Sequence, residues 1–187
     1  MKTLPLSKLD TADHLVTPQQ FDDIDQDSPA LSLMTDFRQH RPHAVGAAAP
    51  ALGVARLMAT EEVDSKLVVD HHRELIGLLT RERLSEQSLL VAQVTMGIDR
   101  ESLTAADLML PRNAMPALDY RDLERATVAD LVATLQEAGE PYCLVRDQEH
   151  QQIRGLISMR ELSERLHQQL SIKPKASVLK VLNQALN

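Results

Sequence analysis

The chain has 187 residues, 43% of them hydrophobic, which is enough for one ordinary domain or two small ones with a proper core. A single cysteine excludes a disulfide framework and a zinc site made of cysteines. The 27 acidic and 20 basic residues leave a formal net charge of −7, which argues against nucleic acid or an anionic membrane as a partner. With two Phe, two Tyr and no Trp, the chain also lacks the aromatic platforms of single-strand binders.

The first 30 residues predict an acidic N-terminal arm. Their composition is typical of a loose cap, with three prolines and six aspartates: Asp10, Asp13, Asp22, Asp23, Asp25 and Asp27. The residues after Met1 are polar and no apolar run approaches 18 residues, so we expect neither a secretory signal nor a membrane span. The location expected on these grounds is the cytoplasm.

Two pairs of similar segments predict a tandem duplication in the middle of the chain. Residues 54–60 (VARLMAT) and 128–134 (VADLVAT) match at five of seven positions. The sequence GLLT at residues 77–80, followed by LSE, returns 78 residues later as GLIS, again followed by LSE. Both blocks keep their order, which favours duplication over coincidence. We therefore divide the chain into an arm (1–30), a first unit (31–100), a second unit (101–168) and a tail (169–187).

Each unit has the pattern strand, helix, strand, strand, helix, which predicts an α/β fold. In the second unit, residues 114–119, 142–145 and 153–157 predict strands, and the apolar stripe of residues 128–135 predicts an amphipathic helix. Thr127 opens that helix in a capping box and Gly139 ends it. Ser158 and Glu161 form a second capping box that begins the last helix.

The first unit shows the same order of elements. Residues 43–47, 66–69 and 74–79 predict strands, residues 54–58 lie on a helix, and Thr80 opens a long helix to about residue 93. The apolar residues of that long helix exceed what one face needs, which favours a dimer that buries Leu84, Leu89, Leu90 and Val91.

The tail predicts a short C-terminal helix after Pro174. One face of this helix is apolar and consists of Val178, Val181, Leu182, Ala185 and Leu186. The face is suited to dock either on the body of the same subunit or on another subunit.

This arrangement resembles a tandem pair of CBS domains, also called a Bateman module, over residues 30–168. The resemblance is carried by Leu33-Met34-Thr35 and Asp107-Leu108-Met109 ahead of the two copies, by the order of elements, and by the glycine, two apolar residues and Thr or Ser that end each last strand. It implies two units packed about a pseudo-twofold axis with two clefts between them. Such modules are regulators rather than enzymes, usually bind AMP, ADP, ATP, NAD or S-adenosylmethionine, and usually dimerise.

The resemblance also implies which residues bind the ligand. In the family, the hydroxyl that follows the glycine motif contacts ribose or phosphate, and an acidic residue three positions later accepts bonds from the ribose. Ser158 and Glu161 match this pattern in the second unit, whereas the first unit has Thr80 and Arg83. Because arginine cannot accept a hydrogen bond, the second unit offers the better nucleotide cleft.

Other residues complete the predicted cleft. Thr127, Thr80 and Ser158 stand at helix N-termini, which favour phosphate through free N–H groups and the helix dipole. The adenine wall would consist of Met115, Ala117 and Ile157, with Arg160 within reach of a phosphate.

A structural interpretation of the same residues stays open. Ser158 and Glu161 also form an ordinary capping box that requires no ligand. Arg83 and Arg160 are typical of solvated helix surfaces, and Met34, Met109 and Met115 of core packing.

The remaining reactive residues do not point to catalysis or to a metal. His40, His43, His71 and His72 lack metal-ligand spacing, and Cys143 lies in an apolar strand without a basic partner. Hydrolase and nucleotide-hydrolysis motifs are absent from the sequence. Two functions therefore remain: a homodimeric sensor of an adenine nucleotide that signals to an unknown effector protein, or a ligand-free dimerisation and interaction module of the same fold.

Overall fold

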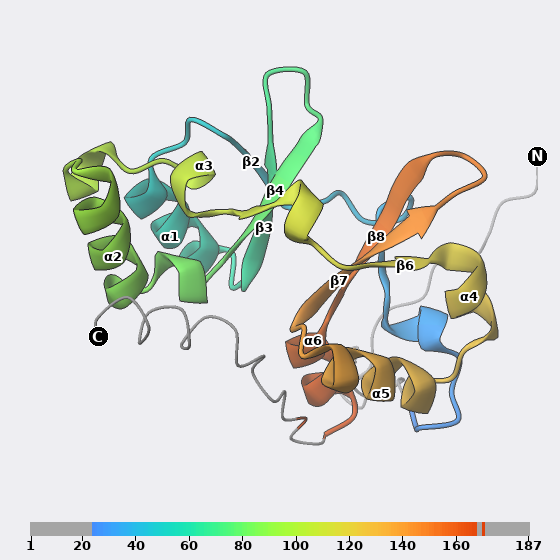
Figure 1. Ribbon diagram of the computed structural model, residues 1–187. Helices are drawn as coiled ribbons and strands as arrows, with labels where there is room; N and C mark the ends of the chain where they lie inside the picture. Colours follow the sequence, from blue (N-terminus) through green and yellow to red (C-terminus); the bar gives the residue numbers. More distant parts are fainter. Residues whose placement is uncertain (1–23, 168–169, 171–187) are drawn as a thin grey trace, which may run out of the picture.

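The computed structural model describes residues 24–167 and Leu170, and these residues form two units that each contain one four-stranded sheet (Figure 1). Most of the predicted arm and of the tail lies outside the described residues, including the expected C-terminal helix. Among the helices that the structure describes, none is long and apolar enough to cross a membrane.

The first unit follows the predicted order of elements. It contains β2 (Ala44–Gly46), α1 (Ala51–Thr60), β3 (Ser65–Val69), β4 (Leu75–Thr80), the short 3-10 helix η3 (Glu82–Leu84), α2 (Glu86–Met96), η4 (Arg100–Ser102) and α3 (Ala105–Leu108). Strand β2 pairs parallel with β3, and β3 pairs antiparallel with β4. The parallel pair requires a crossover, which α1 provides.

The second unit repeats this arrangement, with a short helix between its first strand and the crossover helix that the first unit lacks. It contains β6 (Ala117–Asp119), α4 (Tyr120–Arg125), α5 (Val128–Ala138), β7 (Tyr142–Asp147), β8 (Gln152–Ser158) and α6 (Met159–Arg165). Strand β6 is parallel to β7, and β7 is antiparallel to β8. Helix α4 was not predicted. Asp119 starts it by accepting a bond from the Arg121 backbone N–H, an N-cap that overrides the weak apolar pattern of this stretch.

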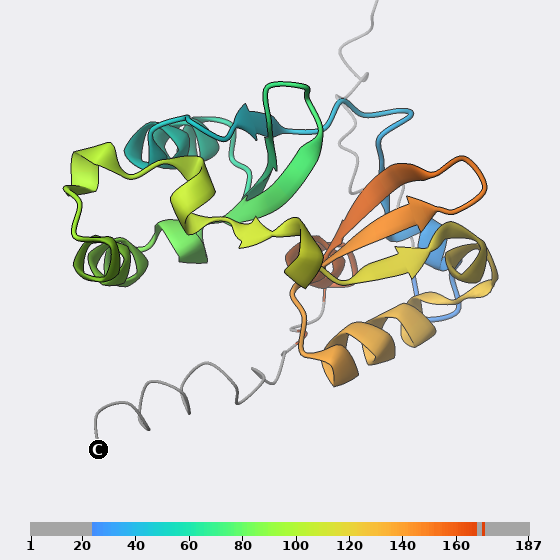
Figure 2. The same ribbon diagram turned by 45° about the horizontal axis from the view of Figure 1, so that its top comes forward.

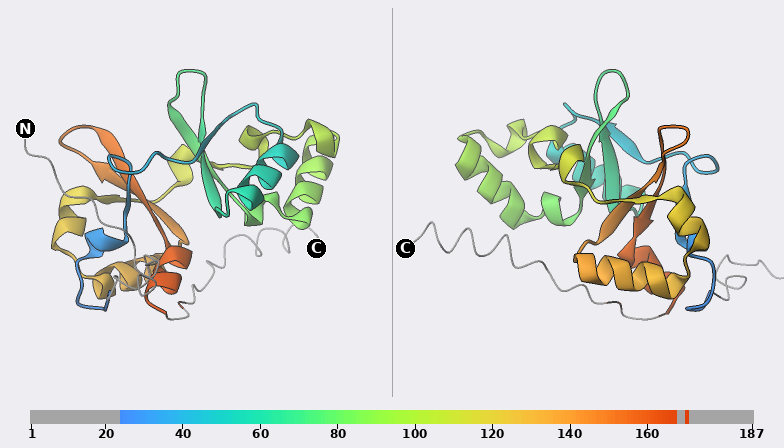
Figure 3. Two further views of the ribbon diagram at one scale, coloured as in Figure 1. Left: turned by 180° about the vertical axis from the view of Figure 1, so that it is seen from behind. Right: turned by 45° about the vertical axis from the view of Figure 1, so that its right-hand side comes forward.

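The two units exchange the short segments that lead into them. The first leading segment contains η2 (Ala30–Leu33) and β1 (Thr35–Asp36), and β1 pairs with β8 of the second unit. The second contains α3 and β5 (Leu110–Pro111), and β5 pairs with β4 of the first unit. The chain after β1 then crosses from one unit to the other (Figure 3). The spatial units therefore interleave along the chain, since each includes a strand from the segment that leads into the other.

The helix ends follow the local sequence in part. Thr127 and Asp130 form the predicted capping box of α5, and Gly139 ends this helix with a φ of 66°. The predicted long helix from Thr80 is wrong, because residues 82–84 form η3 and α2 begins only at Glu86. Ser85 interrupts the helix there: its backbone is extended, and its side chain accepts a bond from the Ser88 N–H.

Each unit has its own hydrophobic core, and a third apolar cluster joins them. The first core lies among α1, α2, α3 and the first sheet, and the second lies among η2, α4, α5, α6 and the second sheet. Figure 2 shows α1 and α2 on the side of the first sheet that faces away from the second unit. Between the units, Leu67, Leu75 and Leu78 of the first sheet pack with Leu144 of the second. The sheets are thus fixed against each other by apolar contact.

Candidate functional site

A cavity of about 170 Å³ lies between the two units and contains part of the predicted site. Ser158, Arg160 and Glu161 enter its wall from the end of β8 and the first turn of α6. The rest of the wall comes from β1 and the segment that follows it, from β3 and the loop before it, and from β7, β8 and α6. These elements contribute Thr35, Phe37, Arg41, Pro42, His43, Glu62, Val63, Asp64, Ser65, Leu67, Tyr142, Leu156 and Glu164.

Ser158 leaves its hydroxyl available at this cavity. The residue is the N-cap of α6 and is only 5% exposed, yet its side chain forms no cap hydrogen bond. The predicted capping box of Ser158 and Glu161 is therefore wrong. The interpretation of these two residues as a helix cap alone loses its support.

Glu161 turns toward the first leading segment instead of toward its own helix end. Its Oε2 accepts a hydrogen bond of 3.3 Å from the Thr35 hydroxyl. Although the residue as a whole is exposed, protein atoms crowd the carboxylate. This desolvation, with Glu164 and Asp64 nearby, raises the pKa of Glu161, while the Thr35 bond opposes the rise.

Arg160 connects the two units across the cavity mouth. Its guanidinium donates to Asp64 Oδ1 of the first unit and, through Nε, to Glu164 Oε1 at 2.8 Å. Asp64 Oδ1 also forms an ion pair with Arg81, whose Nε lies 3.0 Å away. Arg160 is exposed, as expected of a solvated side chain, and it also takes part in an ion-pair network beside Ser158 and Glu161.

The charges in the cavity wall favour hydroxyl groups over free phosphate. Glu62, Asp64, Glu161 and Glu164 face Arg41, Arg160 and His43. Carboxylates accept well from a ribose, whereas a phosphate must compete with Asp64 and Glu164 for Arg160. Tyr142 adds a phenol to the wall, and burial raises the pKa of Tyr142 to about 12, so the group stays protonated and can donate.

Comparisons with known proteins bear on this arrangement. No protein-family model and no curated protein matches the sequence. Solved structures do match. An uncharacterized conserved protein from Pyrococcus horikoshii gives a TM-score of 0.55 at 15% identity, over 80% of this chain and 100% of the other. CBSX2 in complex with AMP gives 0.53 at 18% identity, over 73% and 94%. A hemolysin-like protein containing a CBS domain, from Oenococcus oeni PSU, gives 0.52 at 16%, over 75% and 91%.

This chain has the fold of a tandem CBS-domain pair. The expected α/β fold with two CBS units is thereby confirmed. In CBS terms, the Ser158 cavity lies between the last strand of the second unit and the segment leading into the first.

Three predicted residues lie away from the Ser158 cavity. Ile157 is fully buried in the core of the second CBS unit and cannot face a ligand. Met115 packs at the apolar cluster between the units, and Ala117 is an exposed residue of β6. Neither of these two lines the cavity. The wall predicted from Met115 and Ala117 is supplied by the first unit, because the leading segments cross.

Thr127 does not offer a free helix N-terminus. Its hydroxyl donates to Asp130 Oδ2 at 2.8 Å and accepts from the Asp130 N–H. The N–H groups of Val128 and Ala129 donate to the carbonyls of Ser28 and Gln26 at 2.9 and 3.0 Å. The first N–H groups of α5 are therefore already bonded, and the predicted phosphate contact at Thr127 has no donors left.

Thr80 and Arg83, the equivalents of Ser158 and Glu161, serve the first unit differently. Arg83 Nη1 donates to the carbonyls of Leu108 and Met109 at 3.2 and 3.3 Å. Thr80 is buried at the end of β4, and its hydroxyl accepts from the Arg83 N–H at 3.4 Å. Arg83 is thus not the expected solvated side chain. It binds the second leading segment, as Glu161 binds the first, and burial lowers the pKa of its guanidinium.

The sequence prediction missed Thr35, Arg41, His43, Asp64 and Tyr142 as residues of this cavity. The internal repeat contained a partial signal, since Leu33-Met34-Thr35 stands in the first copy where a leading segment begins. Nothing in the repeat shows, however, which unit a leading segment contacts. Only the tertiary structure shows this pairing.

The histidines and the cysteine have structural contacts. His43 Nδ1 lies 2.9 Å from Glu61 Oε2, which also binds the buried Lys66 Nζ at 2.5 Å. The rings of His71 and His72 lie 3.8 Å apart. Over residues 24–167 and Leu170, no group of three or more metal-ligating side chains could hold an ion. Cys143 is buried as expected, and burial raises the pKa of its thiol to about 11.

Proposed function

We propose that this chain is a regulatory CBS module that binds an adenosine-containing ligand in the Ser158 cavity and transmits the binding to an effector protein. The observation that carries the proposal is the uncapped Ser158 hydroxyl beside the Glu161 carboxylate, in a cavity that both units line. Glu161 accepts the ribose hydroxyls, Ser158 contacts ribose or phosphate, and Arg160 is the nearest cation for a phosphate. The AMP complex of CBSX2, a structure of the same fold, supports this choice of ligand.

Binding in this cavity couples to the packing of the units. A volume of about 170 Å³ is below the roughly 300 Å³ of the smallest usual ligand pockets, so a nucleoside extends into the adjoining cavity of about 560 Å³, which Asp64, Ser158 and Arg160 also line. A phosphate on Arg160 displaces Asp64, which belongs to the other unit. Ligand binding therefore weakens a contact between the units and shifts their relative packing. This displacement is the proposed regulatory signal.

The test is a thermal-shift titration with AMP, ADP, ATP, NAD and S-adenosylmethionine at millimolar concentration. A ligand at about a hundredfold its Kd adds about 2.7 kcal/mol, which raises the Tm of a chain of this size by about 5–10 °C. We expect Ser158→Ala with Glu161→Gln to abolish the shift. Thr80→Ala, the same kind of change at the equivalent position of the first unit, should preserve it. Equal loss in both variants would overturn the site.

A specific observation supports dimerisation, which the second candidate function, a ligand-free dimerisation module, requires. Leu89 is buried and Leu84 packs against the first core, so they are not free for the predicted dimer contact. The exposed apolar side chains on or next to α2 are Leu90, Val91, Val94, Met96 and Ile98. Val94 is 77% exposed, and such a face is typical of an interface.

The partner proposed for this face is a second copy of the chain. Sedimentation at micromolar concentration should show a dimer, and Val94→Glu should convert it to a monomer with unchanged Tm at low concentration. A dimer with no thermal response to any of the five ligands would favour this second function over the sensor. A monomer in the unsubstituted protein would contradict it.

A further inference from the structure

A second cavity, of about 460 Å³, lies between the β3–β4 hairpin of the first unit and the β7–β8 hairpin of the second. Both hairpins project on the same side of the molecule (Figures 1 and 2). This hairpin cavity shares Phe37, Pro42 and Leu67 with the Ser158 cavity, but it contains neither Ser158 nor Glu161. It is therefore a different place from the proposed nucleotide site.

The wall of the hairpin cavity is rich in arginine in a chain of net charge −7. Its charged lining residues are Arg38, Arg73, Arg112 and Arg154, against the single carboxylate of Glu74. The cations come from both units and from the segments that cross between them. A concentration of guanidinium groups within a concave surface favours an anion.

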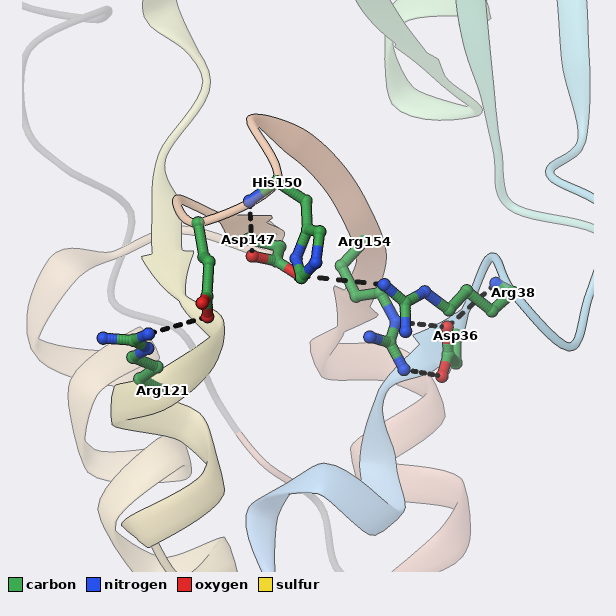
Figure 4. Close-up of polar contacts among 7 residues, drawn as sticks. Asp36, Arg38, Arg121, Asp147, His150 and Arg154 are labelled. Carbon is green, nitrogen blue, oxygen red and sulfur yellow. Dashed lines mark hydrogen bonds and ion pairs between the residues drawn. The ribbon is translucent and has the colours of Figure 1, made fainter.

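Two of the four arginines are already engaged with carboxylates behind the wall (Figure 4). Arg154 binds Asp36 through two hydrogen bonds of 2.8 Å. Arg38 Nη2 lies 3.9 Å from Asp147 Oδ2, and Asp147 also contacts His150 at 2.9 Å. The charge offered to a ligand therefore comes mainly from the other two arginines.

Arg73 and Arg112 have no carboxylate within ion-pair distance among the residues that the structure describes. Arg112 makes one long contact of 3.4 Å to the Leu75 carbonyl. Arg73 has a φ of 65° in the hairpin turn, and its side chain is exposed. Guanidinium groups bind phosphate through paired charge-assisted hydrogen bonds, and these two are available for them.

Apart from Gln151 and Gln152, the rest of the cavity wall is apolar. Phe37, Leu67, Val69, Leu75 and Ile153 line it, together with Pro42 and Ala44. A bare inorganic ion would leave this surface uncovered. A molecule with an apolar body and one phosphate group would contact both the arginines and the apolar wall.

From this arrangement we infer that the hairpin cavity binds a small organic phosphate, with the phosphate on Arg73 and Arg112 and the body against Phe37 and its apolar neighbours. The site uses residues of both units, so its occupation fixes the two hairpins relative to each other. The proposed phosphate contacts, Arg73 and Arg112, line the hairpin cavity and not the Ser158 cavity.

The test uses phenyl phosphate as the probe, titrated by calorimetry into the full chain at low salt. We expect saturable binding that Arg73→Ala with Arg112→Ala weakens by at least about tenfold. The matched control is Arg56→Ala with Arg125→Ala, which removes the same charge from two helices away from the cavity and should change the Kd less than twofold. Equal weakening by both pairs would show a general charge effect and overturn the inference.

Two further variants sharpen the result. Glu74→Gln removes the carboxylate of the wall and should tighten binding by about two- to threefold. Ser158→Ala should leave the affinity for phenyl phosphate unchanged, since the probe has no ribose. Loss of binding in Ser158→Ala, or no saturable binding up to about 10 mM, would refute the hairpin site and leave the nucleotide proposal unaffected.

Discussion

Asp36 and Arg154 show how one ion pair holds a leading segment in place. Asp36 is 8% exposed in β1, and Arg154 reaches it from β8 of the second unit while lying 4.6 Å from the Tyr120 ring centroid. The paired guanidinium bonds outweigh desolvation and lower the pKa of Asp36 to about 2. Because the contact is nearly buried, removal of one partner leaves a charge without compensation.

We expect Asp36→Asn to lower the free energy of unfolding by about 2 kcal/mol at pH 7. The folded-state pKa lies below the unfolded value, so the unfolded chain takes up the proton first. The contribution is therefore complete above about pH 4 and is lost as the pH falls toward 2. In urea unfolding at pH 7, 4 and 3, the difference in the free energy of unfolding between Asp36→Asn and the unsubstituted protein should become smaller as the pH falls. A difference that stays constant over this range, or one matched by the exposed Asp99→Asn, would contradict the assignment.

At the scale of elements, the glycine of each last strand packs directly against the Leu-Met motif of the segment that leads into the other unit. A Cβ at Gly77 would lie 2.5 Å from Met109 Sδ and 2.6 Å from the Leu110 carbonyl. At Gly155 it would lie 2.7 Å from Met34 Cγ and from the Thr35 carbonyl. Each glycine is thus required because the other unit's leading segment passes directly over its strand.

Alanine at either glycine should therefore destabilise the protein. We expect Gly77→Ala and Gly155→Ala each to cost about 1–3 kcal/mol, since backbone atoms of β5 or β1 must move. Gly46→Ala is the matched control, because nothing lies within 4 Å of its added Cβ. Thermal or urea unfolding measures the three variants. If Gly46→Ala were as destabilised as the other two, the effect would be general to glycine in these strands.

At the scale of the whole molecule, the two CBS units are one folding unit. They exchange strands β1 and β5, and they share the cluster of Leu67, Leu75, Leu78 and Leu144. Neither sheet keeps all four of its strands if the other unit unfolds. Cooperative unfolding follows from this topology.

A substitution in one core should therefore weaken both units. Leu131→Ala, in the second core, should lower stability by about 2–5 kcal/mol and reduce amide protection in β3 and β4 of the first unit as much as in β7 and β8. Leu79→Ala, in the first core, is the reciprocal variant. Hydrogen exchange followed by mass spectrometry measures both. Protection lost only in the substituted unit would show that the units unfold separately.

Local sequence by itself determined the repeat, the α/β order and several element ends. The Thr127 box and Gly139 act within one helix, and the strands are marked by short apolar runs such as residues 142–145, so these features were predictable. The Leu-Ser-Glu triplet marks the limit of such reasoning. Ser85 caps α2, whereas Ser163 lies inside α6 and donates to the Met159 carbonyl.

Only the tertiary structure decided which residues share a cavity. Ser158 and Glu161 were found from the sequence, but Thr35 meets them because β1 pairs with β8, and Asp64 meets them because Arg160 binds it from the other unit. Met115 and Ala117 lie outside this cavity. Arg83 likewise differs from the prediction of a solvated side chain, because its guanidinium donates to the Leu108 and Met109 carbonyls. A repeat records that two copies are alike. It does not record how they are paired, because pairing depends on contacts between residues far apart in the chain.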